Sequence, residues 1–140
     1  MNLPNHVKKK PLWWNLIPWL SSFTANAIYP NVYVPKNIYE NLKGDNPDPQ
    51  YISVLIHEET HLKREREIGW FIFGIKYLLL PKFRFNEELI AVKASMNYLK
   101  SQGLHCDLSK KAKYLSSWIY LWPVSYDYAK KELEKAWRKQ

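Results

Sequence analysis

Two histidines four residues apart give the sequence its clearest chemical potential. They are His57 and His61, and Glu58 follows directly after the first. On a helix such a pair lies on one face, one turn apart, so both imidazoles can converge on one ion. Neutral imidazole suits Zn²⁺, and three protein ligands leave one position open for water. The HExxH pattern therefore predicts a zinc-dependent hydrolase with one Zn²⁺ per chain.

Glu58 has a separate role in this prediction. Zinc lowers the pKa of a bound water molecule to about 7. A carboxylate beside the first histidine can reach that water without ligating the metal. It can take up the proton during attack on a peptide carbonyl and pass it to the leaving amine. Glu58 is therefore the predicted catalytic base.

The third ligand must come from elsewhere in the chain. The candidates are Glu87, Glu88, His105, Cys106 and His6. A glutamate in the first turn of a second helix is well placed to face the motif helix, which favours Glu87 or Glu88. His105 follows Gly103 and fits a loop better. Cys106 is the single cysteine and fits a small core residue better than a ligand.

The motif requires a helix, and the local signals provide one. Asp48 is a suitable N-cap, with Pro49 at the first helical position. The helix should run to about Glu67 and end at Gly69. Its buried face should contain Ile52, Leu55, Ile56 and Leu62, whereas residues 63–67 should be charged and exposed.

A second helix should carry the two glutamates. Asn86 is a suitable N-cap, which would put Glu87 and Glu88 in the first turn, where acids suit the helix dipole. Apolar residues then follow at spacings of three and four, and Gly103 should stop the helix. These apolar residues are Leu89, Val92, Met96 and Leu99.

The remaining elements are shorter. Residues 1–22 look irregular, with one short helical piece. Two β-rich runs flank Pro30–Asn31 within residues 24–34, which indicates two strands or one bent strand near an edge. Residues 38–42 suit a helical turn or two. The loop 44–47 follows. A helix should start after Ser109 and break at Pro123, and the last helix should run from about Ser125 to Trp137.

The apolar segment from Ile68 to Leu80 contains Lys76 and is too short to span a bilayer. We expect a buried helix there, with an interfacial membrane contact as the second interpretation. Near the N-terminus, a basic stretch precedes an aromatic run at residues 12–20. It resembles a signal peptide only loosely, because Pro11, Asn15 and Pro18 interrupt it and no clean cleavage site follows.

Composition fits a single domain over residues 1–140, with 46% apolar residues and a formal charge of +8. The basic runs at residues 8–10, 110–113 and 130–131 are interpreted as solvated faces rather than a nucleic-acid footprint. One cysteine cannot form an internal disulfide, so nothing indicates an oxidising compartment, and a cytoplasmic location is the prediction.

Three blocks carry a family resemblance: residues 26–34 (NAIYPNVYV), 53–61 (SVLIHEETH) and 88–91 (ELIA). In this order and spacing they resemble the minigluzincins, small soluble relatives of the catalytic domains of HtpX-type and CAAX-prenyl-protease membrane metallopeptidases. The resemblance implies an α+β fold of zincin or gluzincin type. A small mixed β-sheet would pack on the HExxH helix, a glutamate helix and one or two C-terminal helices.

The same resemblance implies roles for further residues. Glu88 would be the third metal ligand, and the edge strand Asn26–Ile28 would bind the main chain of a peptide or protein substrate by strand addition. Residues 1–22 or 110–140 could fill the cleft in a latent form. Val92 departs from the group, which usually has Asp there. The outer contact to a histidine would then fall to Glu87, Glu65 or a backbone carbonyl.

Two questions stay open at this stage. A residue that polarises the developing oxyanion is expected, and the candidates are Tyr120, Tyr126, His105 and Arg84. The alternatives to a peptidase, active or latent, are a metal-binding interaction module without catalysis and a basic nucleic-acid-binding protein. The peptidase prediction includes no nucleic-acid partner and no transmembrane segment, and leaves the oligomeric state open.

Overall fold

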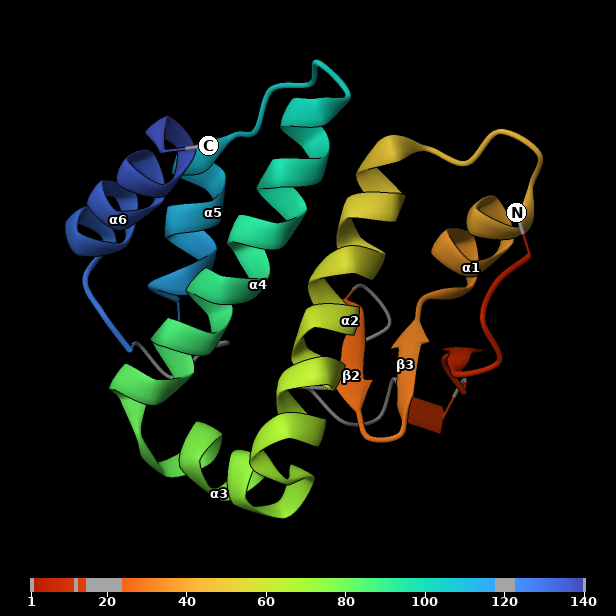
Figure 1. Cartoon of the computed structure of the whole chain (residues 1–140), viewed down its shortest axis with the longest axis horizontal. Helices are drawn as coiled ribbons and strands as arrows, with labels where there is room; N and C mark the ends of the chain where they lie inside the picture. Colours follow the sequence, from red (N-terminus) through yellow and green to blue (C-terminus); the bar gives the residue numbers. More distant parts are fainter. Residues whose placement is uncertain (1, 12, 15–23, 118–122, 140) are drawn as a thin grey trace.

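Two long helices, α2 (Pro49–Ile68) and α4 (Pro81–Ser101), lie side by side in the middle of the molecule (Figure 1). The computed structural model describes residues 2–11, 13–14, 24–117 and 123–139. A small sheet and helix α1 (Lys36–Lys43) lie beside α2, whereas α5 (Leu108–Leu115) and α6 (Tyr126–Arg138) lie on the α4 side. Helix α3 (Trp70–Leu79) connects the two long helices. The described residues therefore confirm an α+β fold with a small mixed sheet.

The sheet has the order β1-β3-β2, formed by β1 (Val7–Lys9), β3 (Asn31–Val34) and β2 (Asn26–Ile28). β1 is parallel to β3 and β2 is antiparallel to it, so β2 is an edge strand. This confirms the interpretation of two strands around Pro30–Asn31. The prediction that residues 1–22 are irregular is wrong at β1. Its pairing with β3 is non-local, and three residues are too few to show a strand period.

The start of α2 follows the local signals. The Asp48 Oδ1 atom accepts a hydrogen bond from Gln50 N at 2.8 Å, and Pro49 opens the helix. Gly69 ends it with φ = 93°, a left-handed value that glycine tolerates best. One part of the prediction is wrong: Glu65 lies in the expected exposed stretch but is buried. Its carboxylate is directed towards the sheet.

The prediction that Asn86 caps the glutamate helix is also wrong. Helix α4 begins at Pro81, which takes the first helical position, with Leu80 as N-cap. Proline is well suited to that position because its fixed φ is helical and its missing N–H is not needed there. Glu87 and Glu88 consequently lie more than a turn inside α4, and helix packing rather than the N-terminal dipole determines their surroundings.

Helix α3 departs most from expectation. The segment was predicted to be buried, but Phe73 is the buried residue of this 10-residue helix. Its other large apolar side chains are mostly exposed, including Phe71 at 61% and Leu79 at 67%. Within the described residues, no helix is long and apolar enough to cross a membrane.

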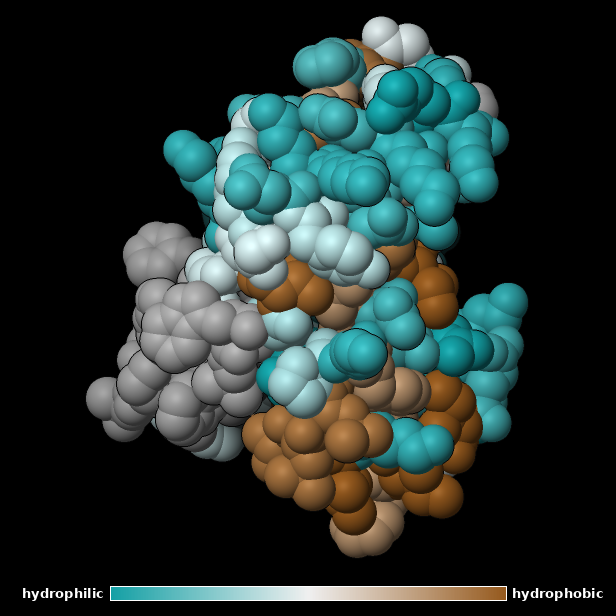
Figure 2. Space-filling view, turned by 90° about the vertical axis from the view of Figure 1, so that its left-hand side faces the viewer, coloured by the Kyte–Doolittle hydropathy of each residue, from teal (hydrophilic) through white to brown (hydrophobic). Residues whose placement is uncertain are grey.

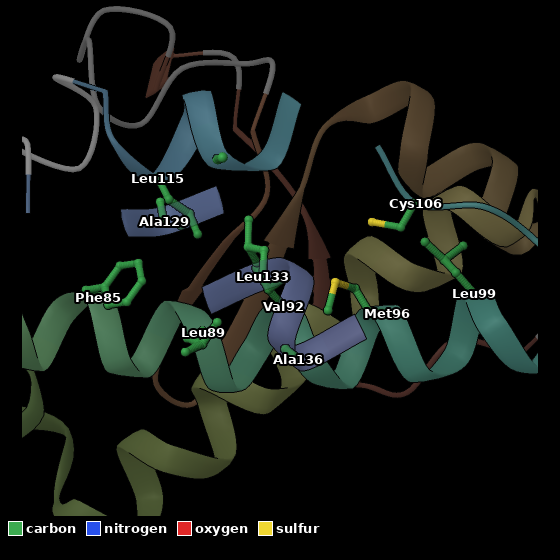
Figure 3. Packing of buried hydrophobic residues seen from close by; sticks show 11 residues of the cluster. Phe85, Leu89, Val92, Met96, Leu99, Cys106, Leu115, Ala129, Leu133 and Ala136 are labelled. Atoms are coloured by element: carbon green, nitrogen blue, oxygen red, sulfur yellow. The ribbon is translucent and has the colours of Figure 1, made fainter. Parts of the chain in front are cut away.

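The apolar core has two parts, one on each side of the seam between α2 and α4. One part joins α4 to α5 and α6, and Figure 3 shows α4 side chains facing those of the C-terminal helices. Its members include Phe85, Leu89, Val92, Met96, Leu99, Cys106, Leu115 and Leu133. The other part joins the sheet, α1 and α2. Apolar packing therefore supports the α2–α4 interface from the outer side of each helix.

Helix α6 agrees closely with prediction, whereas α5 ends at Leu115, well before the predicted break at Pro123. Asp107 caps α5 through a hydrogen bond from Lys110 N at 2.9 Å, so this helix begins slightly before Ser109. Ser125 caps α6 through Tyr128 N at 3.3 Å. The predicted break near Pro123 follows residues 118–122, which lie outside the described residues.

Candidate metal centre

The two motif histidines and Glu88 converge at the seam between α2 and α4. His57 Nε2 and His61 Nε2 lie 3.2 Å apart. The Glu88 carboxylate lies across from them, with Oε2 at 3.4 Å from His57 Nε2 and Oε1 at 3.1 Å from His61 Nε2. Each residue offers one ligand atom, and these atoms all lie within 4.8 Å of one another. The three side chains thus form one compact donor set.

The spacing of the two imidazole nitrogens suits a small tetrahedral ion. Zinc bound at about 2.0–2.1 Å in tetrahedral geometry holds its ligand atoms about 3.3 Å apart. The two Nε2 atoms lie 3.2 Å apart, and each lies 3.1–3.4 Å from a different oxygen of the Glu88 carboxylate. Two imidazoles and one carboxylate are also a donor set found in catalytic zinc sites. The donor types therefore suit Zn²⁺, and the three residues lie close enough together to hold one metal ion.

Glu87, the neighbouring candidate, is directed elsewhere. Arg64 of α2 donates two hydrogen bonds to its carboxylate, from Nε at 2.8 Å and from Nη2 at 2.9 Å. This fork geometry occupies both carboxylate oxygens. Successive residues on a helix point about 100° apart, so Glu88 can face the histidines only if Glu87 does not. Glu88, rather than Glu87, therefore lies with the two histidines.

The remaining ligand candidates are not part of this donor set. His6 Nε2 lies 3.1 Å from Glu59 Oε1, on a partly exposed surface. Cys106 is buried within the apolar core, as expected, and burial raises the pKa of its thiol. His105 stacks edge-on to Trp137 at a ring distance of 6.1 Å.

The charged groups of the site shift one another's pKa values. Burial by itself would lower the pKa of His61, but the Glu88 carboxylate outweighs that effect and raises the pKa to about 9. Burial would raise the pKa of Glu88, yet the two histidines hold it well below its usual range. In the metal-free protein at neutral pH, the site therefore contains an imidazolium paired with a carboxylate.

Glu58 lies beside this donor set without joining it. Burial raises the pKa of its carboxyl, and the two histidines and the Ala27 backbone oppose that shift. A raised pKa suits a group that must take up and release a proton near neutral pH. Glu58 is 9% exposed and lines the same cavity as the three candidate ligands. Glu58 thus lies next to the His57, His61 and Glu88 cluster without being one of its three donors.

Lys10 corrects the interpretation of residues 8–10 as a solvated face. Its side chain is buried, with the ammonium 5.9 Å from the Trp14 ring centroid. Burial lowers the pKa of Lys10 to about 8, although the charge of Glu58 opposes the shift. A cation from the N-terminal strand region thus acts electrostatically on the candidate base. Lys8 and Lys9 remain exposed.

Glu65, one of the groups predicted to make the outer contact to a histidine, makes no hydrogen bond to His61, whose buried Nδ1 has no partner among the described residues. The Glu65 Oε2 atom accepts a hydrogen bond from Tyr29 N at 2.9 Å, and its charge acts on His61. Burial raises the pKa of Glu65. Glu65 therefore connects α2 to the turn between β2 and β3 and lies close enough to influence a candidate ligand. Val92, where the resembled group usually has an acid, is packed in the core.

Tyr77 of α3 is a site residue that the sequence analysis missed. Its hydroxyl donates a hydrogen bond to Glu88 Oε1, and its ring lies 6.3 Å from that of His61. Phe73, one turn earlier, stacks against Tyr77 at 5.7 Å. The spacing of Phe73 and Tyr77 was visible in the sequence, but nothing local indicated that α3 folds back over the motif helix.

No family model, curated protein or solved structure matches this chain. The case for the site therefore depends on its own geometry and on the sequence motif.

The donor set opens into a cavity rather than into packed core. A cavity of about 230 Å³ is lined by His57, Glu58, His61, Glu88, Tyr77, Tyr114 and the β2 residues Asn26 and Ala27. A second cavity of about 500 Å³ adjoins His57 and Glu58 on the α5 side. The edge strand β2 thus borders the same space as the candidate base.

The oxyanion candidates named from the sequence are not gathered at the donor set. Arg84 donates from Nη1 to the Tyr77 and Leu78 carbonyls at the end of α3. Tyr126 packs against the core, and Tyr120 lies outside the described residues. His105 lines the larger cavity. Two tyrosines that were not among these candidates, Tyr77 and Tyr114, line the smaller cavity instead.

The described residues of both terminal ranges include elements of the fold. Residues 1–22 contain β1, which pairs with β3, and residues 110–140 contain most of α5 and all of α6, which build the core. Residues 15–22 and 118–122, also parts of those predicted covering ranges, lie outside the described residues. Removing either whole range would take away structural elements.

Proposed function

We propose that this chain is a zinc-dependent endopeptidase of gluzincin type, as the resemblance to minigluzincins implies. The observation that carries the proposal is the convergence of His57, His61 and Glu88 within 4.8 Å, beside Glu58, in an accessible cavity. A structural pair of surface histidines would not need a buried carboxylate from another helix directed at both rings.

A zinc ion held by these residues would supply Lewis-acid activation of a water molecule and of the scissile carbonyl. Glu58 would accept the proton from that water and return it to the leaving amine. Its raised pKa supports this role, because proton return is harder for an ordinary, strongly acidic carboxyl. Tyr77 would hold the Glu88 carboxylate in place.

Substrate binding is proposed at β2. This strand is at the sheet edge, and its residues Asn26 and Ala27 line the cavity that contains Glu58. An extended peptide can add to such an edge through main-chain hydrogen bonds. The buried Asn26 Oδ1 makes no hydrogen bond to the described residues.

Metal content is the first test. Purified protein should contain one zinc per chain by elemental analysis, and His57→Ala should remove it. A wild-type protein that holds no zinc after loading and desalting would overturn the proposal. Retention of zinc by His57→Ala would move the metal away from this site.

Peptide cleavage is the second test, with Glu58→Gln compared to Glu59→Gln as a matched control. Glu59 lies next to Glu58 but pairs with His6 on the partly exposed surface. Glu58→Gln should keep zinc and lose nearly all cleavage of a fluorogenic peptide library. Glu59→Gln should keep both. A zinc-loaded wild type that cleaves no peptide would favour the alternative of a metal-binding interaction module.

A further inference from the structure

Helix α3 has two unlike faces. Phe73 and Tyr77 point inward, where they contact each other and lie close to His61 and Glu88. Exposed apolar side chains cover the rest of the helix and its C-cap. We call this set the α3 patch, and it consists of Trp70, Phe71, Ile72, Ile75, Leu78, Leu79 and Leu80. Figure 2 shows the hydrophobic surface gathered at the bottom of the molecule, where α3 lies in Figure 1.

An exposed patch of this composition needs a partner. Single exposed apolar residues are ordinary on protein surfaces, but contiguous patches of large residues mark interaction sites. Trp70 and Phe71 are each at least 60% exposed, and their rings contact each other at 5.7 Å. Four more residues of the patch are at least half exposed. The described part of the chain does not cover this surface.

Charge around the patch identifies the class of partner. From Gly69 to Asn86 the sequence contains Lys76, Lys82 and Arg84 but no acidic residue. Lys76 and Lys82 are exposed at the patch, whereas Arg84 is buried. The protein as a whole carries a formal charge of +8. An apolar surface flanked by lysines complements a layer that is apolar inside and anionic outside.

We propose that the α3 patch docks on an anionic membrane surface. A helix of 10 residues is about 15 Å long, so it cannot span the hydrocarbon core and would lie in the plane of the interface. Its aromatic residues suit the headgroup level, and Lys76 on α3 and Lys82 at the start of α4 can reach lipid phosphates. Docking of a second copy would instead bring the lysines of two identical patches together.

This orientation leaves the inner face of α3 against the candidate metal centre. Trp70, Phe71 and Leu79 would enter the interface, whereas Phe73 and Tyr77 would keep their contacts with His61 and Glu88. The docking itself does not depend on the proposed peptidase activity. It can therefore be tested on protein with or without metal.

Vesicle flotation tests the proposal directly. The full chain is mixed with vesicles of phosphatidylcholine alone, or with vesicles containing about one third phosphatidylglycerol, and the floated fraction is measured. We expect binding to the anionic vesicles, at least tenfold weaker binding to the neutral ones, and weaker binding at high salt. Failure to float with anionic vesicles at low salt would overturn the proposal.

Apolar substitutions separate docking through α3 from general stickiness. Phe71→Gln and Leu79→Gln together should lower the partition coefficient at least tenfold, because each removes an exposed anchor. Tyr128→Gln on α6 is the control, since Tyr128 is 50% exposed but lies on another helix. Equal losses in the α3 and α6 variants would overturn the assignment to α3. Circular dichroism spectra should be unchanged in all of them.

Charge reversal provides a matched second pair. Lys76→Glu with Lys82→Glu should reduce binding to anionic vesicles at least tenfold, since each lysine near such a surface contributes roughly a fivefold effect. Lys131→Glu with Lys135→Glu on α6 changes the net charge equally and should have a much smaller effect. Similar losses in both pairs would indicate attraction by overall charge and overturn the docking geometry.

The oligomeric state in solution tests whether a second copy of the chain covers the α3 patch. Sedimentation velocity of the wild type should show a monomer at micromolar concentration. A dimer that dissociates in the Phe71→Gln, Leu79→Gln variant would show that another chain covers the patch, and the membrane proposal would be wrong.

Discussion

Tyr77 on α3 donates a hydrogen bond to Glu88 on α4, and this contact connects the exposed connecting helix to the candidate ligand. Glu88 is 2% exposed and faces two histidines of α2. Three consecutive helices therefore meet at one carboxylate. The hydrogen bond fixes one oxygen of Glu88, which limits how the carboxylate can turn towards an ion.

Loss of this hydrogen bond should weaken metal binding more than folding. Outer contacts to metal ligands typically contribute 10–100-fold to affinity, so Tyr77→Phe should reduce zinc affinity at least about tenfold. Tyr51→Phe, on the sheet side of α2, should leave it unchanged. Competition with a chromophoric zinc chelator measures both variants. Equal affinities for Tyr77→Phe and wild type would show that Glu88 does not need this support.

Replacing each of the two adjacent glutamates by glutamine in turn should separate the effect on zinc binding from the effect on folding stability. Glu88→Gln should abolish stoichiometric zinc binding, because an amide is a poor substitute for a carboxylate ligand. Glu87→Gln should keep zinc but lose about 1 kcal/mol of unfolding free energy, because it weakens the hydrogen bonds from Arg64. Elemental analysis and urea denaturation provide the two readouts. Zinc loss in Glu87→Gln alone would reverse the assignment.

Local signals were sufficient for α2. Its N-cap, its first-turn proline, its terminal glycine and the histidine spacing all act within a few residues, so the sequence predicted the helix bounds and the facing histidines. The same reasoning failed for α4, where Asn86 offered a good cap but Pro81 lay earlier. A cap signal cannot show whether a helix has already begun upstream.

Longer-range relationships were outside the reach of the sequence. The apolar run of α3 fits a buried and a surface-docking helix equally well, because burial depends on whether a neighbouring element covers it. β1 is recognisable only through its pairing with β3. The contacts of Tyr77 with Glu88 and of Arg64 with Glu87 likewise depend on how α3 and α2 pack on α4.

Two glycines should respond oppositely to alanine. Gly69 has φ = 93°, so Gly69→Ala forces a side chain into a left-handed conformation and should destabilise the fold by roughly 1–2 kcal/mol. Gly74 lies inside α3 with open space at its Cβ position. Gly74→Ala should therefore stabilise by roughly 0.5–1 kcal/mol. Thermal unfolding of both variants checks the signs, and destabilisation by Gly74→Ala would mean that α3 is not helical there.

Zinc binding should depend steeply on pH. In the metal-free protein the pKa of His61 is raised from its ordinary value of 6.5 to about 9, so at pH 7 the ring carries a proton that zinc must displace. Affinity should rise up to about tenfold per pH unit from pH 7 and level off above pH 9. Calorimetry in buffers of different ionisation enthalpy should show proton release at pH 7.

The unfolding free energy of the metal-free protein should also change with pH, because His61 binds its proton more tightly in the folded state. The raised pKa of His61 contributes stability that is fully present below about pH 6.5 and is lost as pH rises through 9. Lys10 acts oppositely: with its pKa lowered to about 8, it destabilises the fold at low pH, and this cost disappears as pH rises from 8 towards its ordinary 10.5. A Lys10→Met variant should therefore lose stability more steeply between pH 8 and 9 than the wild type.

If zinc affinity were flat between pH 7 and 9, His61 would already be neutral and its pairing with Glu88 would not hold a proton.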